Sequence, residues 1–347
     1  MLRSISFLMA ALLMGSPADS KGLGTVVGYI AAFKGLGNEM RQPGLERYTH
    51  LLLAFVNPTP DGTIVGPGGL ACAPAGGSGM VSNAELHALV ATAHERGTKV
   101  LASLGGAVIP QCGGDWVQLL SPDMRSTLAA NLVDFIERYD LDGLDIDLEG
   151  ELMMRIDGQG NYIPFVAELA TALHKRSKLL SAATGSHPGG AVPDASLPYL
   201  DLLNIMSYDQ IGPTWGAPGA EHSSYEQAEA DLAFWLRKGV QPGKLALGVP
   251  FYGRGFGSYR AGWSLADIAS EFGEAQLDHD VVGQRCAGCN YITYNGLETL
   301  ERKARLAGAW GVGLMVWEVG QDLPDSKGIL RLSRGYKEGR SGVRKQP

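Results

Sequence analysis

The sequence predicts an α/β protein of the (β/α)8 TIM barrel class. Eight short apolar or β-branched runs are predicted strands, and stretches with apolar residues at i, i+3, i+4 and i+7 separate most of them. Eight strands with intervening helices is the count of a closed barrel. The predicted strands are residues 25–32, 50–56, 99–103, 143–148, 179–184, 202–206, 244–249 and 311–317, and the predicted helices are 83–96, 124–138, 162–176, 225–238 and 297–306.

An open doubly wound sheet shows the same alternation, and periodicity alone does not exclude it. The first strand-to-helix turn, however, lacks the Gly-x-Gly-x-x-Gly pattern of dinucleotide-binding sheets. We therefore expect no dinucleotide and no other cofactor.

The N-terminus has the composition of a secretory signal peptide over residues 1–18. Arg3 supplies a positive charge, residues 5–14 are apolar, and the small residues at 16–18 suit cleavage. The apolar stretch is too short for a stable transmembrane helix, although a membrane-anchored N-terminus is the alternative. We expect a secreted or periplasmic protein with one folded domain over residues 22–336 and a basic C-terminal tail over 337–347.

The composition indicates a globular protein with an acidic surface. Of its 347 residues, 45% are hydrophobic and 19% are charged, and the formal net charge is −7. That charge argues against nucleic acid or an anionic membrane as the main partner. We expect a monomer.

Four cysteines in an exported chain favour disulfides. Cys286 and Cys289 can close a tight loop, which leaves Cys72 to pair with Cys112. A zinc site is the alternative, because Cys-x-x-Cys is half of one, but the other two cysteines lack such spacing. The longest interval between strands, residues 252–298, is polar and Gly-rich, and it predicts a short decorated loop between strands seven and eight at the barrel mouth.

The most informative segment is Asp-Gly-Leu-Asp-Ile-Asp-Leu-Glu, residues 142–149. Side chains alternate along a strand, so Asp145, Asp147 and Glu149 point one way and the apolar residues between them point the other. Burying three carboxyls is costly, and crowding keeps at least one of them protonated near neutral pH. A protonated carboxyl at that pH is what a general acid requires.

Clustered acids also bind Mg²⁺ or Ca²⁺, but such sites use loops with carbonyl and water ligands. We therefore expect no metal. Asp142, at the start of the strand, suits a turn or cap as well as a direct catalytic role.

The acidic segment resembles the catalytic motif of family 18 glycoside hydrolases, the chitinase family. Further motifs of this family follow in its order from about residue 25 to 335. They are Val-Gly-Tyr at 27–29, Ala-Phe at 54–55, Ser-Leu-Gly-Gly at 103–106, Met-Ser-Tyr-Asp at 206–209, Gly-Val-Pro-Phe-Tyr-Gly-Arg at 248–254 and Gly-Leu-Met-Val-Trp-Glu at 313–318.

The resemblance implies retaining, substrate-assisted cleavage of β-1,4-linked N-acetylglucosamine. Glu149 would protonate the glycosidic oxygen, and the substrate's own acetamido oxygen would attack the anomeric carbon. Asp147 would orient the acetamide, Asp145 would hold the partner proton, and the Tyr208 hydroxyl would bond the acetamido oxygen. Trp317 would stack under the sugar, and the other binding residues implied are Asp209, Arg254, Tyr29, Phe55 and Met206.

Aromatic residues outside these motifs divide into two groups. Trp116, Trp215 and Trp263 are placed in loops and are candidates to extend the cleft, whereas Trp235 and Trp310 suit packing on helices. His187 follows strand five and could line the cleft.

Two features depart from the family pattern. Ala107 stands where many members have Trp, and the interval between strands seven and eight is too short for the full α+β insertion of processive chitinases. Both suggest an open cleft and endo-cleavage of chitin or chitooligosaccharides. The alternatives are an endo-β-N-acetylglucosaminidase acting on N-glycans or cell-wall glycan, and a non-catalytic sugar-binding lectin.

Overall fold

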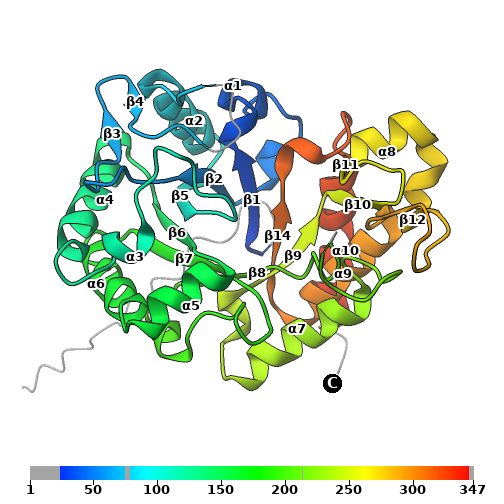
Figure 1. Cartoon of the computed structure of the whole chain (residues 1–347). Coiled ribbons are helices and arrows are strands. Elements are labelled where there is room, and N and C mark those ends of the chain that lie inside the picture. Colours follow the sequence, from blue (N-terminus) through cyan, green and yellow to red (C-terminus); the bar gives the residue numbers. More distant parts are fainter. Residues whose placement is uncertain (1–23, 75–78, 213, 344–347) are drawn as a thin grey trace, which may run out of the picture.

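The computed structural model describes residues 24–74, 79–212 and 214–343. Within these ranges eight parallel strands close a barrel in the order β1-β14-β9-β8-β7-β6-β5-β2 (Figure 1). The barrel strands are β1 Val26–Ala31, β2 His50–Val56, β5 Lys99–Gly105, β6 Gly143–Asp147, β7 Leu179–Thr184, β8 Leu202–Ile205, β9 Leu245–Pro250 and β14 Gly313–Trp317. The predicted barrel class is confirmed, and each strand lies within two residues of its predicted bounds.

Alternating side chains divide the core into two parts. Val27 and Tyr29 of β1 belong to a small cluster inside the barrel, and Val26 and Ile30 belong to the larger cluster between the barrel and its helices. Because both faces of each strand are buried, the strands are apolar almost throughout, as is usual for parallel sheets.

Helices surround the barrel and cover its outer face (Figure 1). The five predicted helices are present, and α1, α3, α5 and α10 were not predicted. The helices of the barrel are α1 Leu36–Glu39, α2 Asn83–Glu95, α3 Trp116–Leu119, α4 Arg125–Tyr139, α5 Gly150–Gly158, α6 Tyr162–His174, α7 Tyr225–Arg237, α9 Leu297–Trp310 and α10 Lys327–Val343.

The last helix alters the expected C-terminal boundary. Residues 337–343, which the sequence assigned to a basic tail, continue α10. The helix packs closely on α9, because a Cβ on Gly335 would lie 2.2 Å from the Glu301 carbonyl oxygen and one on Gly339 would lie 2.1 Å from that of Arg305. Glycine at these two positions lets the helix backbones meet, so this segment is part of the folded domain.

The interval between β9 and β14 holds more structure than the predicted loop. A four-stranded antiparallel sheet in the order β11-β10-β13-β12 is joined to one helix, and it lies to one side of the barrel (yellow and orange in Figure 1). The elements are β10 Tyr252–Phe256, β11 Gly262–Ser264, α8 Leu265–Phe272, β12 Val281–Gly283 and β13 Tyr291–Thr293. Strands of three to five residues are too short to give a clear alternating pattern, so the sequence predicted only a loop. We call residues 252–296 the insertion.

Both predicted disulfides are present. Cys72 bonds Cys112 near the barrel mouth, and Cys286 bonds Cys289 between β12 and β13. The other small elements are β3 Val65–Gly66 and β4 Gly69–Leu70, which pair as a hairpin. The predicted signal peptide lies outside the described residues, and none of the helices in the described ranges has the length and apolar character of a membrane span.

Removal of the disulfide that closes the longer loop tests the contribution of that bond to stability. Cys72 and Cys112 are 40 residues apart, so their bond restricts the unfolded chain strongly. Replacing both by Ser should lower the free energy of unfolding by about 2–4 kcal/mol in urea titrations. The pair Cys286 and Cys289, only 3 residues apart, is the matched control and should lose less. Equal losses from the two double variants would contradict this expectation.

Candidate active site

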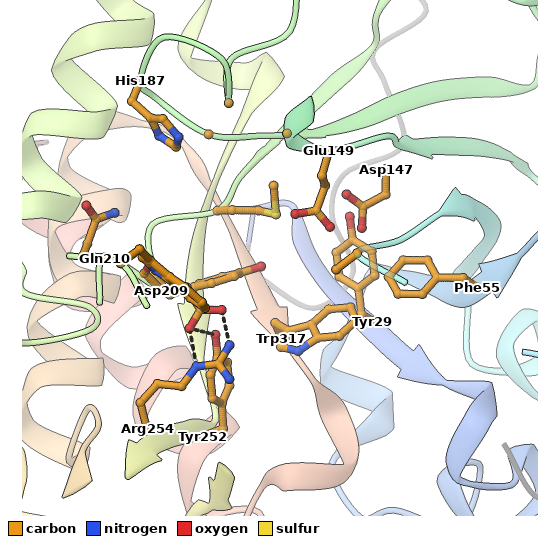
Figure 2. Close-up of a pocket in the computed structure, with 17 residues that line it drawn as sticks. Tyr29, Phe55, Asp147, Glu149, His187, Asp209, Gln210, Tyr252, Arg254 and Trp317 are labelled. Atoms are coloured by element: carbon orange, nitrogen blue, oxygen red, sulfur yellow. Dashed lines mark hydrogen bonds and ion pairs between the residues drawn. The ribbon is translucent and has the colours of Figure 1, made fainter. Parts of the chain in front are cut away.

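One large cavity opens at the carboxyl ends of the barrel strands, where βα loops gather. Its volume is about 630 Å³, and we call it the cleft. Nine of the ten predicted site residues line it (Figure 2). They are Tyr29, Phe55, Asp147, Glu149, Met206, Tyr208, Asp209, Arg254 and Trp317.

The tenth, Asp145, lies deeper and does not line the cleft. It is fully buried in β6 and accepts four hydrogen bonds, from Tyr29 Oη at 3.0 Å, Ser103 Oγ at 2.7 Å, Ser181 Oγ at 2.6 Å and Asn204 Nδ2 at 3.1 Å. These donors come from β1, β5, β7 and β8. Burial raises the pKa of Asp145, and the four hydrogen bonds work in the opposite direction.

The expected role of Asp145 was to hold the partner proton and to tune Asp147. Its hydrogen bonds come from a tyrosine, two serines and an asparagine. Its negative charge raises the pKa of Asp147, and it accepts a hydrogen bond from the Tyr29 hydroxyl, which lines the cleft.

Asp147 and Glu149 form a carboxyl pair at the floor of the cleft (Figure 2). Burial raises the pKa of Asp147 well above its ordinary value, and the charges of Glu149 and Asp145 raise it further. Burial also raises the pKa of Glu149, although a hydrogen bond with Asp147 opposes the rise. The hydrogen bond between the two carboxyls thus raises the pKa of Asp147 and lowers that of Glu149, which favours Asp147 as the donor.

The backbone places Glu149 where β6 becomes α5. Glu149 is the last extended residue before the helix, and Gly150 follows with φ of +52°. Few side chains tolerate that backbone conformation, so glycine suits the turn. The turn ends the strand directly after Asp147 and presents the Glu149 carboxyl to the cleft.

Aromatic rings form a second part of the cleft. The Trp317 ring at the end of β14 stacks on Phe55 at 5.5 Å between centroids with an interplanar angle of 19°, and it lies 5.2 Å from the Tyr29 ring. Glu318, the next residue, is buried and accepts a hydrogen bond from Lys34 Nζ at 2.5 Å. The indole is thus fixed by stacking on one side and by the ion pair that the following residue forms with the exposed Lys34.

Asp209 lies at the centre of a polar cluster opposite these rings. It pairs with the Arg254 guanidinium through both carboxyl oxygens and accepts the Tyr252 hydroxyl at 2.8 Å. His222 Nδ1 lies 3.6 Å from its Oδ1. Burial alone would raise the pKa of Asp209, but hydrogen bonds from His222 and Arg254 and the guanidinium charge outweigh it, so the pKa falls below its ordinary value.

Burial raises the pKa of Tyr208, and the negative charges of Asp147, Glu149 and Asp209 raise it further. Its buried hydroxyl has Met315 Sδ as an acceptor at 3.6 Å. A thioether is a weak acceptor, so an oxygen of a bound molecule would be a stronger partner for this hydroxyl. Met206 precedes it and contributes an apolar side chain to the cleft.

The sequence profile of Glycosyl hydrolases family 18 matches residues 25–322 of the chain. The protein belongs to family 18 of the glycosyl hydrolases. The predicted resemblance is confirmed, and the matched range covers the barrel together with the insertion.

Named relatives share moderate identity with this family 18 chain. A "chitinase-like effector" of Moniliophthora roreri is 29% identical over 286 residues, which cover 74% of this chain and 64% of the relative. A "Class V chitinase" of Arabidopsis thaliana is 27% identical over 278 residues, covering 67% and 71%. The chain spans only 12% of a third relative, "Probable chitinase 10" of Drosophila melanogaster, with 26% identity.

A solved structure is similar over nearly the whole chain. The GH18 chitinase ChiB from the chitin utilization locus of Flavobacterium johnsoniae has a TM-score of 0.75 and 28% identity, covering 90% of this chain and 94% of that one. A chitinase from Bacteroides thetaiotaomicron has a TM-score of 0.73 at 24% identity, which supports the shared fold.

Two tryptophans lie away from the family 18 cleft, contrary to expectation. Trp116 is buried in α3, where its Nε1 donates to Asn57 Oδ1 at 2.9 Å. Trp263 in β11 packs against Tyr259 and Phe272 within the insertion. Both belong to the larger apolar cluster outside the barrel. Trp215 and His187 do line the cleft, and Trp235 and Trp310 pack against the core as predicted.

Other contributors were not identified from the sequence. Gln210 and Tyr252 line the cleft, and His222 supports Asp209 from a fully buried position. Gln210 directly follows the motif at 206–209 and Tyr252 lies within the motif at 248–254, which is the signal that could have found them. Asp142 takes the structural role, because its Oδ2 accepts hydrogen bonds from the Val100 backbone N–H and His94 Nε2, both at 2.8 Å.

The raised pKa of Asp147 predicts how stability depends on pH. The folded protein holds a proton that the unfolded chain releases, so this site contributes stability in acid that is lost as pH rises. Asp147→Asn removes the titration, and its free energy of unfolding should fall less between about pH 4 and about pH 7 than that of the wild type.

Urea titrations across this pH range provide the measurement. Glu151→Gln is the matched control, because it removes an exposed carboxyl four residues along the chain. The control should keep the wild-type pH dependence. If Asp147→Asn keeps it as well, Asp147 does not hold the proton in the folded state.

Proposed function

We propose that the protein hydrolyses β-1,4-linked N-acetylglucosamine, in chitin or chitooligosaccharides, with retention and with the substrate's acetamido group as nucleophile. The observation that carries this proposal is the Asp147–Glu149 carboxyl pair at the floor of the cleft, opposite a wall of stacked aromatics. Aromatic faces bind the C–H faces of a sugar, and the carboxyl pair supplies a proton. Membership in family 18 supports the same reaction.

Glu149 is the proposed general acid and base. Burial raises its pKa, which favours uptake of a proton, and Asp147 beside it can supply that proton or take it back. Glu149 would protonate the glycosidic oxygen as that bond breaks. The resulting carboxylate would then remove a proton from the water that attacks the anomeric carbon.

The state of the other cleft carboxyls favours a nucleophile from the substrate. Among the described lining residues the carboxyls are Asp147, Glu149 and Asp209. Asp147 is protonated and bonded to Glu149, and Asp209 is held in an ion pair with Arg254. Neither is a free carboxylate suited to form a glycosyl ester. The acetamido oxygen can attack instead, with Tyr208 donating to it and Asp147 bonding its N–H.

Two other functions deserve comparison. The same carboxyl pair would serve an endo-β-N-acetylglucosaminidase acting on N-glycans or cell-wall glycan. The second is a non-catalytic sugar-binding role. The observation behind it is the similarity to a relative named "chitinase-like effector". The presence of both Asp147 and Glu149 favours turnover over binding alone. We also propose export to an extracellular or periplasmic location, on the composition of residues 1–18, and action as a monomer.

Substitution of Glu149 tests the proposed reaction. Glu149→Gln cannot transfer a proton and should lower kcat on chitooligosaccharides about 10²- to 10⁴-fold. Glu151→Gln, an exposed carboxamide change nearby, should keep wild-type activity. Full activity of Glu149→Gln would contradict the proposed role.

The choice of substrates separates the candidate functions. We expect cleavage of chitooligosaccharides and none of fully deacetylated oligosaccharides, which lack the proposed nucleophile. A high-mannose glycoprotein assayed in parallel should remain intact. Cleavage of the glycoprotein alone would favour the N-glycan activity, and binding of chitooligosaccharides without cleavage would favour the lectin.

A further inference from the structure

One side of the cleft is formed by residues 215–223, which follow β8 and which we call the cleft-wall segment. Its first residue, Trp215, lines the cleft and is 48% exposed. The indole Nε1 donates to the Asp209 carbonyl oxygen at 2.8 Å. The ring packs on the Gly212 backbone, where a Cβ would lie 2.1 Å from the indole, and its other contacts are few enough that its position also depends on the backbone that carries it.

The end of the cleft-wall segment is fixed by the insertion and by α9. The His222 backbone N–H donates to Thr293 Oγ1 at 3.3 Å. The Ser223 carbonyl oxygen accepts from Asn295 Nδ2 at 2.7 Å and from Lys303 Nζ at 2.9 Å. All five residues are buried, so this end has little freedom.

The middle of the segment has a different contact with the insertion. Glu221 forms an ion pair with Arg285, which lies between β12 and β13. Next to this pair, Gly219 has φ of +85° and packs so closely that a Cβ would lie 3.0 Å from the Cys286 Cα. The disulfide between Cys286 and Cys289 closes the same connection. The insertion therefore touches the middle of the cleft-wall segment through one charged pair and one close backbone contact, in addition to its hydrogen bonds to His222 and Ser223.

We infer that Arg285 is a positioning residue for substrate binding: through Glu221 it holds the cleft-wall segment, and so Trp215, in place for outer sugar units. This inference rests on the proposed function for the identity of the sugar. A segment held before binding loses less conformational freedom when substrate arrives. The carboxyl pair lies at the end of β6 and the start of α5, apart from the Glu221–Arg285 ion pair, which we call the brace. Affinity therefore depends on the brace and the chemical step does not.

Charge reversal at either end tests the brace. Glu221→Arg and Arg285→Glu each place like charges together and should weaken binding of chitohexaose about two- to fivefold, because the pair is partly exposed. The double variant restores opposite charges and should recover the original affinity. Titration calorimetry in the Glu149→Gln background gives Kd without turnover. When the same charge reversals are made in protein that keeps Glu149, KM should rise by a similar factor and kcat should stay unchanged.

Glu274→Lys is the matched control. It breaks another ion pair of the insertion, with Lys327 of α10 at 2.9 Å, and should leave Kd unchanged. Arg285→Gln, a milder change, should weaken binding less than reversal does. Circular dichroism and melting temperature identify any variant that fails to fold.

Two results would overturn the inference. One is an unchanged Kd in both single reversals, and the other is a double variant that remains as weak as its parents. If the wild-type protein binds chitohexaose and never cleaves it, the proposed function is contradicted. The Kd test of the Glu221–Arg285 pair is still valid in that case. Absence of any binding by the Glu149→Gln protein would contradict both.

Discussion

The burial of acidic side chains on one face of β6 is the constraint on which the rest of the site depends. A buried carboxyl is costly unless it is protonated or hydrogen-bonded. The fold meets this cost in two ways. Asp145 is surrounded by four donors from β1, β5, β7 and β8, and Asp147 keeps a proton that it shares with Glu149. The first solution fixes the barrel interior, and the second leaves a proton available at the cleft.

The remaining parts of the cleft are arranged around this pair. Asp209 is kept ionised by Arg254, and its negative charge helps to raise the pKa of Glu149. Trp317 faces the pair from β14, the strand beside β1 in the barrel, and the Tyr29 ring lies between them in Figure 2. The insertion reaches the opposite side through Arg254 and the cleft-wall segment. The carboxyl pair, the Trp317 ring and the cleft-wall segment thus come from separate elements. Substrate preference can therefore change while the carboxyl pair stays in place.

Much of this fold was predictable, because a parallel strand buried on both faces has a distinctive apolar composition. The alternation of acids and apolar residues in β6 also located the carboxyl pair. The partners of Asp145 were harder, because they lie 36 to 116 residues away and are ordinary Ser, Asn and Tyr residues. Nothing in a single sequence marks Ser181 or Asn204 as its donors until the barrel closes.

The errors have a common physical origin. Trp116 and Trp263 lie in short elements between strands, where no periodicity tells whether a ring faces the cleft or a local core. The insertion was predicted as a loop because its strands have only three to five residues. The helix α10 was not predicted, and the glycines within it permit close contact with α9.

The central claim is that Asp147 carries the proton of the carboxyl pair in the resting protein. Infrared difference spectroscopy tests it most directly, since a protonated carboxyl absorbs apart from carboxylates. The account predicts a carboxylic acid band near neutral pH that loses intensity in Asp147→Asn and is displaced when chitooligosaccharide binds to the Glu149→Gln protein. A band that persists unchanged in Asp147→Asn would contradict the account.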